Sequence, residues 1–195
     1  ARKNIGFLYA IHQGAQFVFD FDDDNLLPVD KDGRVISPLI AATVVDQDAT
    51  KLPNTRIVST KTLVLNHHPL MGATVENSWA RGFPLQGIQN KETQGKLKGE
   101  IKDIDMQSIA VMQFCANGNP DIDAVHRLVH PLPMTFESAT TPNADRPLSV
   151  PKNSFVPYNA QATIHTQQAM WALFLPFTVP GRVSDIWRGY FAEAL

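Results

Sequence analysis

The stretch FVFDFDDDN, residues 17–25, constrains this chain more than any other part of its sequence. A bulky apolar run ends in four carboxylates within five positions, those of Asp20, Asp22, Asp23 and Asp24. Like charges this close repel one another, and burying even one of them unpaired is costly. No Lys or Arg lies in this stretch or in the five residues after it. We therefore expect a cation from elsewhere to neutralise the cluster.

The residues around the cluster predict a helix followed by a buried strand. Ile5, Leu8 and Ile11 recur at helical spacing, and Gly14 is suited to ending that helix. The apolar run at 17–21 is nearly unbroken, which is typical of a strand covered on both faces in a parallel sheet. The carboxylates then fall at the carboxyl end of the strand, the edge where open α/β sheets bind ligands.

Further along, the sequence predicts short strands and helices joined by long loops. Expected strands cover 56–60, 62–66 and 108–116, and expected helices cover 121–129, most of 159–175, and 184–195 with Ser184 as its cap. The segments between them are rich in Gly and Pro, which favours irregular connections. There is no internal repeat and no sign of a second domain, so residues 1–195 are predicted to form one α/β domain segment.

Composition excludes several classes of protein. The 195 residues carry a formal net charge of −2, so no basic excess indicates nucleic-acid binding. The single cysteine, Cys115, cannot form an internal disulfide, and its apolar surroundings favour a structural thiol over a nucleophile. The most apolar stretch, 169–179, is too short to span a bilayer and contains Pro176. Helical patterns at both ends lead us to expect a piece of a longer protein, incomplete at both ends.

Four interpretations of the acidic cluster compete. A solvated acidic turn is the plainest, since Asp is common in turns, but the adjoining apolar strand argues against it. An EF-hand loop needs Gly at its sixth position and Glu at its twelfth, where counting from Asp20 gives Asn25 and Lys31. A haloacid-dehalogenase-like motif continues with Gly and Thr, where this chain has Asp23 and Asp24. The DxD motif of glycosyltransferases remains, in which a divalent ion bridges a carboxylate and a diphosphate.

Five longer blocks occur in order along the chain. They are ARKNIGFLYAIHQGAQFVFDFDDDN (1–25), RGFPLQGI (81–88), ANGNPDIDAVHRL (116–128), YNAQATIHTQQAMWALFLPFTV (158–179) and GRVSDIWRGYFAEAL (181–195). Together they resemble the STELLO family of Golgi glycosyltransferase-like proteins, with looser similarity at 26–80 and 131–150. A more distant resemblance is to the reversibly glycosylated polypeptides, which act as nucleotide-sugar mutases.

The resemblance implies a GT-A-like fold, in which a Rossmann-like mixed sheet flanked by helices binds a nucleotide sugar. It implies a metal-dependent glycosyltransferase that uses Mn²⁺ or Mg²⁺, a UDP-sugar donor and a glycan or small-molecule acceptor. It further implies a lumenal Golgi domain of a membrane-anchored parent, active in glycan or cell-wall polysaccharide synthesis and linked to a Golgi enzyme complex. Two alternatives stay open, a non-catalytic scaffold of a cellulose synthase assembly and a nucleotide-sugar mutase.

The acidic turn and the start of the first helix supply the expected cofactor-binding residues. We expect Asp22 and Asp24 to bind the metal, with Asp23 in the same nucleotide site. Three residues that open the first helix are expected to meet the phosphates or the base, unless they form a solvent-facing helix end: Arg2, Lys3 and Asn4. For Asp20, an equally good interpretation is a buried carboxylate that pairs with Lys3.

The last helix supplies the expected catalytic residue. Asp185 is the candidate general base that deprotonates an acceptor hydroxyl, although the helix dipole alone favours Asp near a helix start. Arg182 and Arg188 would pair with a diphosphate or with Asp185. Trp79 and the RGFP stretch (81–84) would form an acceptor platform, with packing in the core as the default for Trp79.

Overall fold

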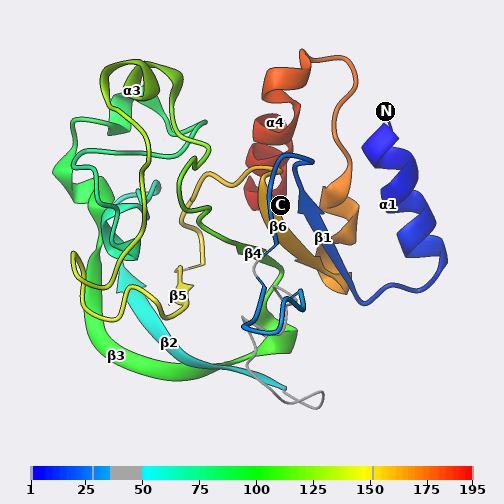
Figure 1. Cartoon of the computed structure of the whole chain (residues 1–195), viewed down its shortest axis with the longest axis horizontal. Coiled ribbons are helices and arrows are strands. Elements are labelled where there is room, and N and C mark those ends of the chain that lie inside the picture. Colours follow the sequence, from blue (N-terminus) through cyan, green and yellow to red (C-terminus); the bar gives the residue numbers. More distant parts are fainter. Residues whose placement is uncertain (1, 28, 36–49, 151, 195) are drawn as a thin grey trace.

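The computed structural model describes residues 2–27, 29–35, 50–150 and 152–194. Two three-stranded sheets organise them (Figure 1). The first sheet has the spatial order β1 (Phe17–Phe21), β6 (Ala162–Thr166), β4 (Val111–Gln113), with both pairings antiparallel. The second has the order β3 (Lys96–Asp105), β2 (Lys51–Ser59), β5 (Leu148–Ser149), where β2 runs antiparallel to β3 and parallel to β5.

Helices gather mainly around the first sheet. Figure 1 shows α1 (Arg2–His12) and α4 (Gly181–Ala194) beside β1 and β6, while the short α3 (Ala124–Val129) lies in the half of the molecule that holds the second sheet. The other helical elements are 3₁₀ turns: η1 (Pro69–Met71), η2 (Leu85–Gly87), η3 (Lys91–Gln94), η4 (Met106–Ser108) and η5 (Gln167–Leu173). In the described part of the chain, no helix has the length and apolar character needed to cross a bilayer.

Each half has its own apolar cluster. Phe7 of α1 packs with Met170 and Leu173 of η5, and Val18 of β1 lies against them. In the other half, Val58 of β2 packs with two buried leucines, Leu65 and Leu70. Burial of apolar side chains therefore holds α1 and η5 together beside β1, where the acidic turn begins.

The α/β class and the first helix and strand are confirmed. Helix α1 ends where expected, since Gly14 has φ +76° and its N–H donates to the Ile11 carbonyl. The expected parallel, doubly covered strand is wrong: among the described residues β1 pairs only with the antiparallel β6, and its ends at Phe17 and Phe21 are about 40% exposed. An apolar run cannot by itself distinguish a central strand from an edge strand, because both bury part of a pleated surface.

Three further predictions need correction. Most of 159–175 was expected to be helical, but ATIHT forms the central strand β6, in which β-branched residues fit, and only a 3₁₀ turn follows. The expected strand at 62–66 is reduced to an isolated bridge between Val64 and Phe155. Ser184 does not cap the last helix, because α4 begins at Gly181 and the Ser184 hydroxyl donates to the Gly181 carbonyl inside the first turn.

Candidate functional site

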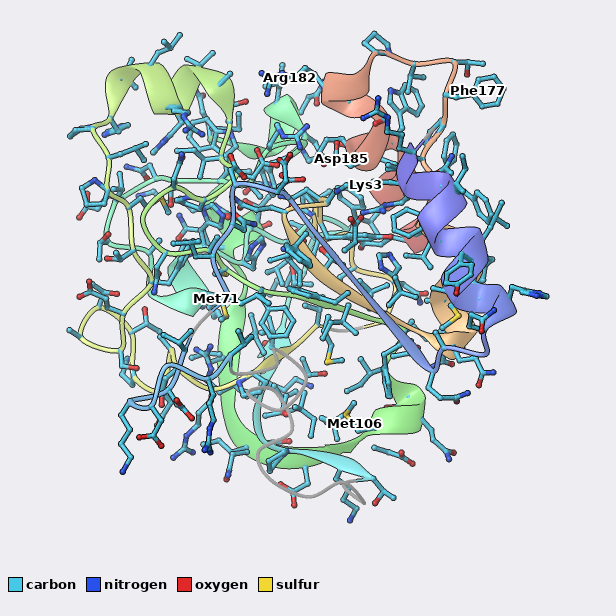
Figure 2. All side chains as sticks on the ribbon, turned by 45° about the vertical axis from the view of Figure 1, so that its right-hand side comes forward. Lys3, Met71, Met106, Phe177, Arg182 and Asp185 are labelled. Carbon is cyan, nitrogen blue, oxygen red and sulfur yellow. The ribbon has the colours of Figure 1, made fainter. Side chains whose placement is uncertain are left out.

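Charged side chains from distant parts of the sequence meet beside the carboxyl end of β1. The carboxylates are those of Asp20, Asp22, Asp121 and Asp185, and the cations are Lys3, Arg81 and Arg188. Figure 2 shows Lys3 and Asp185 in the region between α1 and α4, away from Met71 and Met106 of the other half. The contacts below join these groups into a single site.

Asp20 lies at the bottom of the site, and its carboxylate is held by two cations. It is 3% exposed, with the Lys3 ammonium 2.8 Å from one oxygen and the Arg188 guanidinium 2.7 Å from the other. Arg188 is 2% exposed and lies over the Tyr158 ring, 5.9 Å from its centroid. The alternative in which Asp20 pairs with Lys3 is therefore correct, and Asp20 is a buried structural anchor.

Lys3 also reaches Asp22, the first residue of the predicted metal site. The ammonium lies 3.3 Å from an Asp22 oxygen and so bridges the carboxylates of Asp20 and Asp22. Burial lowers the pKa of Lys3, but the hydrogen bonds and negative charges of these two aspartates outweigh it and raise the pKa above its usual value. A cation was expected beside the acidic cluster, and for Asp20 and Asp22 it is Lys3 of the chain itself, fourteen residues before β1 begins.

Asp22 remains in a negative environment despite Lys3. Burial raises the pKa of the Asp22 carboxyl, the Lys3 ammonium opposes this, and the charges of Asp20 and Asp185 add to the rise. The net effect is a raised pKa. Geometry links the two elements as well, since the Ala160 N–H donates to Asp185 and the Asp22 N–H donates to the carbonyl of the next residue, Gln161.

The other predicted cofactor residues lie at different depths. Asp23 and Asp24 are exposed in the turn after β1, and Arg2 is exposed at the start of α1. Asn4 is engaged elsewhere, because its side-chain amide donates to the Leu175 carbonyl and accepts from the Leu175 N–H. The structure therefore brings Lys3 to the acidic turn and gives Asn4 a role in fixing α1 to the segment after η5.

Asp185 is held by Arg81, which the sequence interpretation named only as part of the RGFP stretch and not as a partner of Asp185. The Arg81 guanidinium donates to both oxygens of Asp185, at 2.6 and 3.3 Å, and also to both oxygens of Asp121, at 2.8 Å. Burial lowers the pKa of Arg81, but the two carboxylates outweigh it and raise the pKa further above its high usual value. Arg182 takes part only through its backbone carbonyl, which accepts from Arg81.

Glycines allow α4 to approach the loops that it contacts. Gly82 has φ +86°, and a Cβ there would lie 2.7 Å from the Ile186 side chain. A Cβ on Gly189 would lie 2.9 Å from the Tyr158 carbonyl. These close approaches place Arg81 against Asp185, and they are possible only because neither position carries a side chain.

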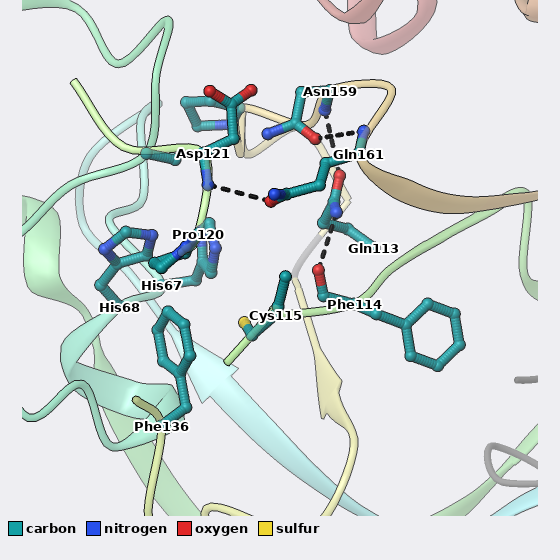
Figure 3. A pocket seen from close by; sticks show the side chains of 13 residues that line it. His67, His68, Gln113, Phe114, Cys115, Pro120, Asp121, Phe136, Asn159 and Gln161 are labelled. Carbon is teal, nitrogen blue, oxygen red and sulfur yellow. Dashed lines mark hydrogen bonds between the residues drawn. The ribbon is translucent and has the colours of Figure 1, made fainter. Parts of the chain in front are cut away.

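The segment 159–161 connects the two ends of the site. The N–H of Ala160 donates to Asp185, while the Gln161 carbonyl accepts from the N–H of Asp22 and from the Asn25 amide. The Gln161 side chain in turn accepts from the Asp121 N–H, as Figure 3 shows. This backbone link explains how carboxylates more than 160 positions apart in sequence come to share one region.

A small pocket lies next to this segment, lined in part by His67, Cys115, Asp121 and Gln161 (Figure 3). Its volume is about 20 Å³, which suits a water molecule but not a sugar. Burial raises the pKa of the Cys115 thiol to about 12, so the thiol stays protonated at neutral pH. This fits the expected structural role of the cysteine rather than that of a nucleophile.

The fit of a divalent ion can be judged from the side chains. Carboxylate oxygens are the ligands that Mg²⁺ and Mn²⁺ prefer, and the Lys3 ammonium already acts as a cation between Asp20 and Asp22. Within the residues that the structure describes, no three His, Cys, Asp or Glu side chains are grouped closely enough to hold a metal ion. Carboxylate oxygens therefore suit a divalent ion chemically. In this structure, however, the Lys3 ammonium occupies the space between the carboxylates of Asp20 and Asp22.

Trp79 and Asp123 have structural roles. Trp79 meets the ring of the buried His126 edge to face, which is the core packing assumed by default. Asp123 caps α3 by accepting from the N–H groups of Val125 and His126. The role of Arg81 was missed although the residue opens the RGFPLQGI block, because its partners lie 40 and 104 residues away.

Comparison with known proteins gives two relatives. The chain is 26% identical over 206 aligned residues to the probable glycosyltransferase STELLO2 of Arabidopsis thaliana, and 25% identical over 201 residues to the probable glycosyltransferase STELLO1 of the same plant. Each alignment covers the whole chain but 24% of the relative, so the chain spans about a quarter of their length. No family model matches the chain. The resemblance to the STELLO family is thereby confirmed.

Proposed function

We propose that this chain is the nucleotide-sugar-binding segment of a metal-dependent glycosyltransferase. Its similarity to two probable glycosyltransferases supports the reaction class. The observation that carries the proposal is the convergence of the acidic turn and Asp185, which are joined through the segment 159–161. A sugar transfer needs a donor site and an acceptor site on one face of the protein, and this convergence supports such an arrangement.

The exposed end of the turn is the proposed donor site. Asp22 and Asp24 would hold Mn²⁺ or Mg²⁺, with Asp23 beside them, and a bound ion would supply positive charge to the departing diphosphate. Lys3 and Arg2, at the start of α1, would add charge-assisted contacts to the phosphates. The turn is open to solvent at Asp23 and Asp24, as binding of a soluble donor requires.

Asp185 is the proposed general base for the acceptor hydroxyl. It is 7% exposed, and both of its oxygens accept hydrogen bonds from Arg81. The bound guanidinium stabilises the charged form of Asp185, so the carboxylate becomes a better base if Arg81 gives up one of these bonds. We propose that Arg81 does so in favour of the donor phosphates, since its guanidinium is suited to bidentate oxyanion binding.

The cellular setting follows from the family resemblance. We propose a GT-A-like domain in the Golgi lumen, carried by a membrane-anchored parent, that takes a UDP-sugar and acts in glycan or cell-wall polysaccharide synthesis. Its acceptor would be a glycan or a small molecule, and its partners a Golgi enzyme complex. Two alternatives predict different observations: a scaffold would bind no nucleotide, and a mutase would release a ring-isomerised donor without any acceptor.

Titration calorimetry with UDP in the presence of Mn²⁺ tests the donor site. Asp22→Asn and Asp24→Asn are each expected to weaken UDP binding by about tenfold or more, because each removes a charged metal ligand. Asp32→Asn, which removes the same charge from an exposed position outside the turn, is the matched control and is expected to bind like the wild type.

Equal affinities in all four proteins would place the nucleotide elsewhere. A folded wild-type chain that binds no UDP would favour the scaffold. Product analysis after incubation with a UDP-sugar separates the remaining two functions, since only a mutase gives a ring-isomerised donor.

A further inference from the structure

We infer that the Lys3 ammonium is a built-in competitor of the divalent ion, one that closes the acidic turn until an ion displaces it. This inference rests on the proposed function for the importance of the turn, but its structural basis is independent of any nucleotide. It concerns the regulation of the site by the chain's own first helix.

The position of the ammonium is the first line of support. Lys3 Nζ lies 2.8 Å from Asp20 and 3.3 Å from Asp22, and it also donates to the Phe21 carbonyl at 3.3 Å. Three oxygens from three successive residues thus surround one cation. Asp22 is also a proposed ligand of the divalent ion, and an ammonium and a metal ion cannot both occupy the space beside its carboxylate.

The charge balance around the turn is the second line of support. Arg188 already neutralises the other oxygen of Asp20 from beneath, and Arg81 neutralises Asp121 and Asp185. Among the described residues, Lys3 is the cation that contacts Asp22, and it does so through one carboxylate oxygen, Oδ1. A doubly charged ion at this point would gain more from the carboxylates than a single ammonium does, so exchange is favourable once the ion has lost water.

The exposure of Lys3 makes the exchange possible. Its side chain is 38% exposed, against 2% for the carboxylate of Asp20 and 1% for Arg188. A displaced ammonium can therefore move into water at little cost, whereas Arg188 cannot. The same movement would bring a free cation to the edge of the turn, where the phosphates of a donor are proposed to lie.

Binding of Mn²⁺ alone, without nucleotide, tests the competition. Lys3→Met removes the ammonium and keeps an unbranched side chain. It is expected to raise the Mn²⁺ affinity by at least about tenfold, because the ion no longer meets the repulsion of a positive charge beside Asp22. Lys31→Met removes the same charge from an exposed position outside α1 and the acidic turn and is expected to change the affinity by less than about threefold, through long-range charge alone. Electron paramagnetic resonance of free Mn²⁺ measures all three proteins.

An affinity of Lys3→Met that is equal to or weaker than that of the wild type would overturn the inference, and so would the absence of binding in both proteins. If Lys3→Met does not fold, an experiment on the wild-type protein alone tests the competition. In nuclear magnetic resonance spectra of the lysine side chains, saturating Mg²⁺ should shift the Lys3 signals towards those of solvent-exposed lysines, and an unchanged Lys3 would contradict the competition. These measurements are made without UDP, so the two hypotheses can fail separately. If Lys3 competes with Mn²⁺ but UDP does not bind, the proposed transferase function is wrong and this inference stands. If UDP binds but Lys3 does not compete, this inference is wrong and the proposed function stands.

Discussion

Asp20 and His67 are both buried titratable residues, and the two halves of the molecule keep them buried in different ways. Asp20 lies beside β1 with Lys3 and Arg188 at hydrogen-bond distance. His67 lies before η1 with its Nδ1 buried and without a hydrogen-bond partner among the described residues. Burial lowers the pKa of His67 to about 4, so the ring is neutral at physiological pH.

The neighbouring histidines follow the same pattern as His67. Burial lowers the pKa of His68 well below its usual value, and the nearby rings of His67 and His126 add to the effect. Rings of this group meet edge to face or stacked, as do His67 with His68 and His126 with His130.

Asp20 is thus buried as a charge that two cations pair, whereas His67 and His68 are buried as uncharged rings. Each half also holds the other kind of group, since burial lowers the pKa of His165 in β6 to about 3 and the Arg56 guanidinium of β2 is buried against backbone carbonyls.

Breaking the buried pair should give the largest effect. Arg188→Met leaves Asp20 with Lys3 alone, and we expect a loss of about 3–5 kcal/mol in the free energy of unfolding, as is usual when one partner of a buried ion pair is removed. Urea denaturation at pH 7 measures it. The double variant Arg188→Met with Asp20→Asn should recover part of this loss, and a single-variant loss below about 1 kcal/mol would show that the pair does not anchor α4.

Acidification should give the next largest effect. The unfolded state binds protons to His67 near its usual pKa of about 6.5, and the folded state does so only near a pKa of about 4. The unfolded state therefore holds more protons between these values, and stability falls as the pH falls through this window, by about 2 kcal/mol at pH 5 from this residue alone.

Urea denaturation at pH 7 and pH 5 checks this prediction. His67→Gln should reduce the difference between the two pH values. His12→Gln, at an exposed histidine at the end of α1, should leave it unchanged. Equal pH dependence in wild type and His67→Gln would mean that the half around η1 does not depend on a neutral ring at this position.

The smallest expected effect concerns Arg81 and its two carboxylate partners, Asp121 and Asp185. Arg81→Lys keeps the charge but loses the planar fork that reaches both Asp121 and Asp185, and we expect a loss of about 1–2 kcal/mol. Thermal or urea denaturation measures it, with Arg127→Lys on the exposed face of α3 as the matched control. A loss equal to that of the control would mean that charge alone, without geometry, holds Asp185.

Local patterns predicted the elements that depend on local chemistry. The apolar spacing in residues 5–11 and the left-handed Gly14 were enough for α1, and the helix at 121–129 was found as α3. The need for a cation near the acidic turn also followed from Coulomb repulsion alone. Its identity did not, because the sequence contains many lysines and arginines and no local rule chooses among them.

The sequence by itself determined that four carboxylates follow an apolar strand and that any of them buried there needs a positive partner. Only the tertiary structure decided that Lys3 and Arg188 are the partners of Asp20, and that Arg81 holds Asp185 to Asp121. The reason is separation along the chain, since Arg188 is 168 residues from Asp20 and Arg81 is 104 from Asp185. Such pairs form only after the antiparallel β1 and β6 and the packing of α4 have brought distant segments together, which no local pattern encodes.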